Sequence, residues 1–236
     1  MDVTPFGKYE LLERIAAGGM AEVFLARATG LAGFERRLVI KRIRDEHARD
    51  PRFVQSFVNE ARIGVHLDHP NIVQVYELGR VGDAWYIAME HLHGRDLTRL
   101  RKAVAARDER ISAPVAVRMV ADVCRALAYA HTRTTSDGQP LGLVHRDVSP
   151  HNVVVTFSGE VKLVDFGIAR LMHDRSQEGG ERRVGGGKYA YMSPEQARGE
   201  VHRIGPPTDV YALGVMLYEI CTGRRPESAA PRAMEL

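Results

Sequence analysis

The sequence predicts an α+β protein of two lobes, in which a small β-sheet with one helix precedes a mostly helical lobe. Over the first ninety residues, short runs rich in β-branched and aromatic residues alternate with turn residues. A single helical stretch, residues 50–67, interrupts these runs. Beyond residue 94 they give way to long amphipathic segments, above all residues 112–133. We therefore expect the two lobes to meet near residues 91–94.

The expected elements follow from these patterns. Five segments have strand composition, and they are residues 9–16, 21–27, 36–43, 72–79 and 84–90. In the second lobe Ser112 stands directly before the periodic run, where an N-cap is expected. Residues 136–140 have the composition of a turn, and residues 177–188 have that of a glycine-rich, charged loop.

Composition narrows the classes of function. The chain has 236 residues, with 33 Lys and Arg against 30 Asp and Glu and a net charge of +3. The basic residues are scattered, so no nucleic-acid surface is indicated. No apolar run approaches the roughly 20 residues that cross a bilayer, and we expect no membrane segment. The two cysteines, Cys124 and Cys221, lack metal-ligand spacing and predict reduced thiols in a cytoplasmic protein.

Three features of the first lobe are weak signals when each is taken alone. The pair Gly18 and Gly19 lies between two strand-like runs, where missing side chains let backbone amides approach phosphate oxygens. For this segment taken alone, an ordinary hairpin with glycines at the turn is the favoured explanation. Lys41 ends an apolar strand and Glu60 lies in the helix, and either can be a solvated surface charge.

The strongest signal lies in the second lobe, where three motifs follow one another. They are HRDVSPHN at residues 145–152, VKLVDFGIAR at residues 161–170 and YMSPEQ at residues 191–196. In this order they resemble the eukaryotic-like (Hanks-type) protein kinases, particularly the bacterial serine/threonine branch, over residues 9–225. The resemblance implies a protein-kinase-like fold with an N-lobe at residues 9–92 and a C-lobe at residues 93–225. We expect a short tail at residues 226–236 and a C-lobe that lacks its last helices.

The resemblance also implies catalytic roles. Asp147 would orient the attacking hydroxyl and accept its proton, while Asn152 and Asp165 would bind Mg²⁺, with Mn²⁺ as an alternative. Lys41 would contact the phosphates of ATP and pair with Glu60. Asp209 matches the acid that supports the backbone of the HRD loop. The remaining nucleotide contacts are implied for Ile15, Gly18, Gly19, Val23, Val39, Met89, Glu90, Leu92 and Val154.

Two departures from the family pattern concern the catalytic loop. Ser149 stands where serine/threonine kinases normally have a lysine, and Lys188 stands where a threonine is expected in the activation segment. We interpret this as an exchange, in which Lys188 supplies the ammonium near Asp147 and Ser149 supplies the hydroxyl. The alternative is an inactivated site in which Ser149 caps the turn before Pro150 and Lys188 is solvated.

Further departures concern binding, stability and regulation. Of the three glycines usual in the nucleotide loop only the central one is retained, and Val39 replaces the usual alanine. Glu195 matches a glutamate that normally pairs with a later arginine, so we expect an unpaired buried charge and a marginally stable domain. Arg146 implies a docking site for an activation-loop phosphate, for which Ser176 is the candidate, and a loop that needs no phosphorylation is the equal alternative.

The sequence as a whole predicts a serine/threonine protein kinase that uses ATP and Mg²⁺ and acts on a protein substrate. The alternative is a non-catalytic nucleotide-binding or scaffolding module, which the expected loss of the last helices favours. In either case a partner that covers the exposed part of the C-lobe is expected. The retained set Lys41, Glu60, Asp147, Asn152 and Asp165 favours the enzyme.

Overall fold

The computed structural model describes residues 3–30, 33–135, 137–166 and 189–226. Within these residues the chain divides into two compact units. The first unit comprises residues 3–68 and 73–92, and the second comprises residues 69–72, 93–166 and 189–226. The chain therefore passes into the second unit after Leu92, apart from a short excursion at residues 69–72.

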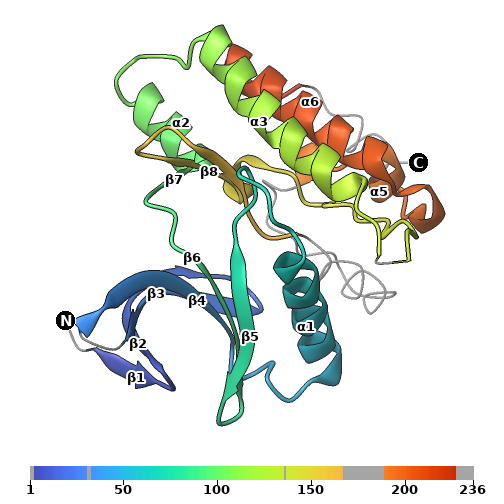
Figure 1. Cartoon of the computed structure of the whole chain (residues 1–236). Coiled ribbons are helices and arrows are strands. Elements are labelled where there is room, and N and C mark those ends of the chain that lie inside the picture. The colour runs from blue at the N-terminus through green and yellow to red at the C-terminus, as the bar shows by residue number, and fades with distance from the viewer. Residues whose placement is uncertain (1–2, 31–32, 136, 167–188, 227–236) are drawn as a thin grey trace. The chain divides into compact units, whose positions relative to one another are not determined.

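The first unit is a six-stranded antiparallel sheet with one helix, as the composition predicts (Figure 1). The strands are β1 (Thr4–Phe6), β2 (Tyr9–Ala17), β3 (Ala21–Thr29), β4 (Glu35–Ile43), β5 (Val75–Val81) and β6 (Ala84–Glu90), in the order β1-β2-β3-β4-β6-β5. The helix is α1 (Pro51–Val65), in which Asp50 caps the first turn by accepting a hydrogen bond from the Arg52 amide at 2.9 Å. β1 is the strand that the sequence prediction missed, because Pro5 argues against a strand except at the edge of a sheet.

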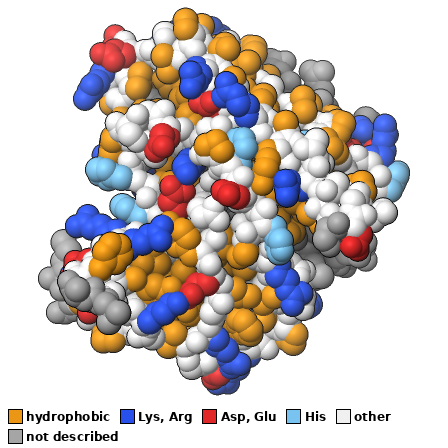
Figure 2. Space-filling view, viewed as in Figure 1, with side chains coloured by type: hydrophobic (Ala, Val, Ile, Leu, Met, Phe, Trp, Pro, Cys, Tyr) orange, Lys and Arg blue, Asp and Glu red, His pale blue; other side chains and the backbone are white. Residues whose placement is uncertain are grey.

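The sheet curls so that residues from both of its edges share one core. Phe6 and Tyr9, near one edge, lie edge-to-face against Tyr86 of β6, with ring centroids 5.4 and 5.8 Å apart. The hydroxyl groups of Tyr9 and Tyr86 both donate to the carboxylate of Glu77 in β5, at 2.9 and 2.8 Å. Figure 2 shows hydrophobic side chains gathered over the curled sheet, with charged side chains around them. These contacts fix the sheet that carries Lys41.

The second unit is mostly helical and contains a small sheet. Its longer helices are α2 (Leu97–Ala105), α3 (Ala113–His131) and α6 (Pro206–Thr222), and α3 packs along α6 (Figure 1). The sheet consists of β7 (Gly94–Asp96), β8 (Val153–Thr156) and β9 (Val161–Leu163), and the short helix α5 spans Pro194–Ala197. Ser112 occupies the N-cap position of α3, but its side chain makes no capping hydrogen bond. Among the described residues, every helix is too short or too polar to cross a bilayer.

Gly94 provides a test of the packing between β7 and β8. A Cβ atom at Gly94 would lie 2.2 Å from the carbonyl oxygen of Val155, a backbone atom that cannot move aside without breaking the strand pair. We expect Gly94→Ala to lower the free energy of unfolding by about 1–3 kcal/mol, the usual effect of overpacking. Urea denaturation followed by circular dichroism measures the change.

The matched control is Gly214→Ala in α6. A Cβ atom there would meet nothing within 4 Å, and alanine favours a helix over glycine by about 0.8–1 kcal/mol. The control is therefore expected to be neutral or stabilising. Equal destabilisation by both substitutions would contradict this account of β7.

Candidate active site

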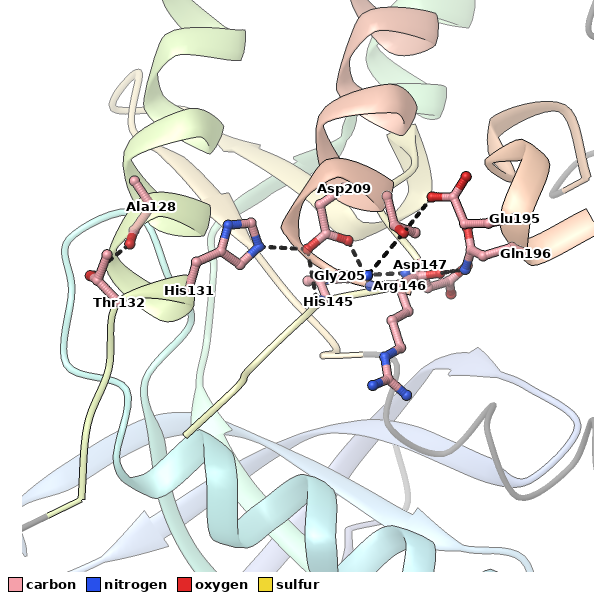
Figure 3. Close-up of polar contacts among 11 residues, drawn as sticks. Ala128, His131, Thr132, His145, Arg146, Asp147, Glu195, Gln196, Gly205 and Asp209 are labelled. Carbon is pink, nitrogen blue, oxygen red and sulfur yellow. Dashed lines mark hydrogen bonds and ion pairs between the residues drawn. The ribbon is translucent and has the colours of Figure 1, made fainter. Parts of the chain in front are cut away.

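The carboxylate of Asp209, in the first turn of α6, is the centre of the polar network of the second unit. The side chain is fully buried. Its Oδ2 accepts hydrogen bonds from the backbone N–H of His145 and from Nε2 of His131, both at 2.8 Å, and its Oδ1 accepts from the N–H of Arg146 at 2.7 Å (Figure 3). A buried carboxylate requires such donors, because desolvating an unpaired charge is costly. The network fixes the backbone at the start of the catalytic loop.

Arg146 has a left-handed backbone conformation, with φ of +66°. A non-glycine residue in this region is strained by about 1–3 kcal/mol, so neighbouring contacts must maintain it. Asp209 binds its amide, and Nε2 of Gln196 donates to its carbonyl oxygen at 2.9 Å. The side chain points away from Asp209 (Figure 3), and its Nε is buried without a hydrogen-bond partner among the described residues. Burial lowers the pKa of the guanidinium.

His145 joins the catalytic loop to the segment that carries Asp165. The imidazole is fully buried, and burial lowers its pKa. Nδ1 accepts from the amide of Asp147 at 3.3 Å, and Nε2 lies 3.1 Å from the carbonyl oxygen of Val164. These partners select the neutral tautomer that carries its proton on Nε2. The ring of Phe166 packs against the imidazole with its centroid 4.8 Å away, which adds a second contact between the two segments.

Asn152 ties Asp147 to the same segment. Its side-chain Nδ2 donates to the carbonyl oxygen of Asp147 at 2.8 Å and to Oδ2 of the Asp147 carboxylate at 3.1 Å. Its own carbonyl oxygen accepts from the amide of Val164 at 2.9 Å. Asp165 follows directly and also has a left-handed backbone, with φ of +56°. The structure thus brings Asp147, Asn152 and Asp165 into one hydrogen-bonded loop system.

Ser149 lies within this loop but does not make the contact that the exchange hypothesis requires. The side chain is 1% exposed, and its Oγ has no hydrogen-bond partner among the described residues. The side chain of Ser149 does not cap the turn before Pro150 either. It is the backbone carbonyl of Ser149 that accepts a hydrogen bond, from the Asn152 amide at 2.9 Å. Lys188, Ser176 and the loop at residues 177–188 lie outside the described residues. The proposed role of Lys188 stays a prediction.

In the first unit, Lys41 and Glu60 form an ion pair. Nζ of Lys41 in β4 lies 2.6 Å from Oε1 of Glu60 in α1, and both side chains are largely buried. The pair connects the helix to the middle of the sheet. An ion pair with so little exposure needs good geometry to offset the loss of hydration, and the short separation provides it.

The other residues that the sequence indicates for nucleotide binding are placed as follows. Gly18 and Gly19 form the turn between β2 and β3, where the amide of Gly18 donates to the carbonyl of Ala21 at 2.8 Å. Val23 lies opposite Lys41, and Val39 opposite Met89, in the registers of neighbouring strands. Ile15 is exposed in β2, Glu90 ends β6 and Leu92 follows it. Val154 lies in β8 of the second unit.

Glu219 is the centre of a second network, which sequence reasoning missed. This glutamate of α6 is 4% exposed and accepts hydrogen bonds from the Tyr191 hydroxyl, from Arg101 Nη1 at 2.9 Å and from Arg225 Nε at 3.0 Å. Burial opposes ionisation, but the three donors outweigh it and hold the pKa of Glu219 below its ordinary value. The one visible signal was an acid within an apolar helical run. Nothing in the sequence indicated its partners.

The prediction that Glu195 is an unpaired buried charge is wrong. Its carboxylate is partly exposed, and Oε1 accepts a hydrogen bond from the hydroxyl of Thr208 at 2.7 Å. The carboxylate therefore has a hydrogen-bond partner within the described residues. Ser193 and Gln196 form a capping box on α5, which the spacing S-x-x-Q could have revealed.

Comparisons with known proteins agree with this geometry. The protein kinase domain family matches residues 9–234. The chain is 46% identical over 229 residues to the tyrosine-protein kinase MasK of Myxococcus xanthus and 36% identical over 232 residues to the serine/threonine-protein kinase PrkC of Bacillus subtilis. The alignments cover 95% and 97% of this chain but 34% and 33% of those proteins, so it spans about a third of their length. The crystal structure of the Mycobacterium tuberculosis PknI kinase domain is similar, with a TM-score of 0.67, 27% identity and coverage of 95% of this chain and 78% of that chain.

Glu219 gives a prediction of pH dependence. Because its pKa in the folded chain lies below the ordinary value of 4.5, its ionised form stabilises the fold at neutral pH, and this contribution is lost as the pH falls through the lowered pKa. We expect Glu219→Gln to reduce the free energy of unfolding at pH 7, and the difference from the wild type to shrink below about pH 4.5. Urea denaturation between pH 7 and pH 4 measures it.

The control for this experiment is Glu109→Gln, which removes an exposed negative charge from the same unit. It should alter stability by less than about 0.5 kcal/mol. A Glu219→Gln variant as stable as the wild type at pH 7 would show that the network contributes nothing.

Proposed function

We propose that this chain, which belongs to the protein kinase domain family, transfers the γ-phosphate of ATP to hydroxyl groups of protein substrates, with serine and threonine as acceptors. The observation that carries the proposal is the hydrogen-bonded loop that holds Asp147, Asn152 and Asp165 together. The ion pair of Lys41 and Glu60 supports it. So do the relatives named as serine/threonine kinases, at 36% and 39% identity.

In this proposal Asp147 orients the substrate hydroxyl and accepts its proton. Its carboxylate is held by the amide of Asn152 at 3.1 Å, and its backbone is held by His145. Phosphoryl transfer depends mainly on positioning and on stabilising charge, so a carboxylate with a fixed orientation suits the role. The neutral form of His145 adds no charge that would compete for the Asp147 carboxylate.

Asn152 and Asp165 suit a hard divalent cation. Because the amide nitrogen of Asn152 is occupied by Asp147, its Oδ1 is the atom that remains for a metal, and Asp165 adds a carboxylate. Mg²⁺ prefers such oxygen ligands and takes its remaining ones from phosphates and water, and Mn²⁺ accepts the same set. Within the described residues, no group of three His, Cys, Asp or Glu side chains could hold a metal ion by itself, without ligands from phosphates and water. Bound with ATP, the cation neutralises phosphate charge.

Nucleotide contacts are proposed for the residues that the sequence indicates. Lys41, oriented by Glu60, would bind the phosphates, and the turn at Gly18 and Gly19 would approach them with its backbone. The adenine would contact the apolar and hinge residues, which are Ile15, Val23, Val39, Met89, Glu90, Leu92 and Val154. The non-catalytic alternative has no comparable support, since the relatives are named as kinases.

Tyrosine is the second candidate acceptor. The relative at 46% identity is named as a tyrosine-protein kinase. Ser149 also replaces the lysine that is usual in serine/threonine kinases, and it makes no side-chain hydrogen bond with the described residues. Acid hydrolysis of a phosphorylated protein, followed by separation of phosphoserine, phosphothreonine and phosphotyrosine, distinguishes the acceptors.

The proposal predicts the effect of removing each catalytic group. Asp147→Asn and Lys41→Met should each reduce phosphate transfer from radiolabelled ATP to a basic protein by about 100-fold or more, because they remove the proton acceptor and a phosphate contact. The controls are Asp108→Asn and Lys102→Met, which make the same chemical changes at exposed positions of the second unit. Activity near that of the wild type in either catalytic variant would contradict the assignment.

The exchange hypothesis gives a separate prediction. If Lys188 supplies the ammonium near Asp147, Lys188→Ala should lose activity about as severely as Lys41→Met, and Ser149→Lys combined with Lys188→Thr should restore it. The same transfer assay measures both. A silent Lys188→Ala would mean that the lysine has no catalytic role and that Ser149 is a tolerated replacement.

A further inference from the structure

The turn between β2 and β3 is held by the segment that follows β4. Three successive carbonyl oxygens of this turn accept hydrogen bonds from two residues of that segment. Nη1 of Arg44 lies 3.4 Å from the oxygen of Gly18, Nε2 of His47 lies 3.0 Å from that of Gly19, and the amide of Arg44 lies 3.1 Å from that of Met20. All of these residues belong to the first unit.

These bonds determine where the amide groups of the turn point. In a trans peptide, the C=O of one residue and the N–H of the next point in opposite directions, and the described residues contain no cis peptide. Because the carbonyls of Gly18 and Gly19 face Arg44 and His47, the N–H groups of Gly19 and Met20 face away from them. Neither N–H has a hydrogen-bond partner among the described residues. Two such adjacent donors are suited to an anion.

We propose that His47 and Arg44 are positioning residues for the nucleotide, which hold the amides of Gly19 and Met20 toward its phosphate groups. This inference rests on the proposed function, because it assumes that the turn covers ATP. Of the two side chains, His47 makes the shorter hydrogen bond to the turn, and its imidazole is held by a neighbouring ring. Its ring packs 4.4 Å from that of Phe53, the first aromatic residue of α1. Oε1 of Glu46 also lies 3.6 Å from Nε2.

The turn itself has few contacts that could fix its backbone. A Cβ atom at Gly19 would meet nothing within 4 Å, so no packed neighbour restricts this residue. The turn also has two glycines where the family pattern has three. The side chains of the turn therefore do not fix its backbone. Hydrogen bonds from His47 and Arg44, which lie outside the turn, do so instead.

The test uses two substitutions that separate the hydrogen bond of His47 from its packing. His47→Phe retains a ring against Phe53 but removes the donor, whereas His47→Gln retains a donor. The matched control is His66→Phe, which alters an exposed histidine whose Nδ1 contacts only its own helix, at the oxygen of Arg62. Binding of a fluorescent ATP analogue to the chain is measured by titration, and backbone order at residues 18–20 is measured by ¹⁵N relaxation without nucleotide.

We expect His47→Phe to weaken binding of the analogue by about 3- to 10-fold, the equivalent of one hydrogen bond, and to lower the order parameters of the turn. His47→Gln should lie near the wild type, and His66→Phe should match it. Unchanged binding and unchanged order in His47→Phe would overturn the proposal, as would failure of the wild type to bind the analogue. If the wild type binds, and the substitution weakens binding, but no phosphate is transferred, the positioning role stands and the proposed kinase activity fails.

Discussion

The buried carboxylate of Asp209 is the interaction on which the rest of the second unit depends. It is fully buried, and its three donors come from the end of α3 and from two successive backbone amides of the catalytic loop. Removing one partner of a buried charged contact costs about 3–5 kcal/mol, a large share of the 5–15 kcal/mol that stabilise a typical domain. The same contacts also hold Arg146 in its strained conformation. Stability and the geometry of the catalytic loop therefore have one source.

The contacts that begin at Asp209 return to the same helix. The carbonyl oxygen of Arg146 accepts a hydrogen bond from Gln196 in α5. Its neighbour Glu195 accepts a hydrogen bond from Thr208, the residue next to Asp209 in α6. Ten residues further along α6, about 15 Å, Glu219 binds Tyr191 before α5 and Arg101 of α2. The catalytic loop and the segment of residues 191–197 are thus both positioned against α6. A helix in a packed core changes shape little, so α6 can keep these two segments at a fixed separation.

The sequence predicted what depends on local pattern and on motifs, and it missed what depends on tertiary partners. Strand alternation predicted β2, β3, β4 and β6 within a few residues, whereas β1 is short and contains Pro5. The three motifs predicted the family, which the comparisons confirm. The roles of His131, Thr208 and Glu219 could not be predicted. Each role depends on a side-chain contact between residues that lie 13 to 78 positions apart in the sequence. Glu195 was misjudged for the same reason, since its partner is the hydroxyl of Thr208, 13 positions away in α6.

In both units, a side chain that binds adjacent backbone groups of a loop orients the functional groups of that loop. In the second unit a carboxylate binds two adjacent amides, which fixes the backbone that carries Asp147. In the first unit the side chains of Arg44 and His47 bind the adjacent carbonyls of the glycine turn. These bonds fix the direction of the N–H groups on the other side of the turn. In both places a side chain from a neighbouring segment satisfies backbone groups on one side of a loop and so determines what the other side presents. Such a contact leaves no motif in the loop itself, so the sequence of the loop alone does not reveal it.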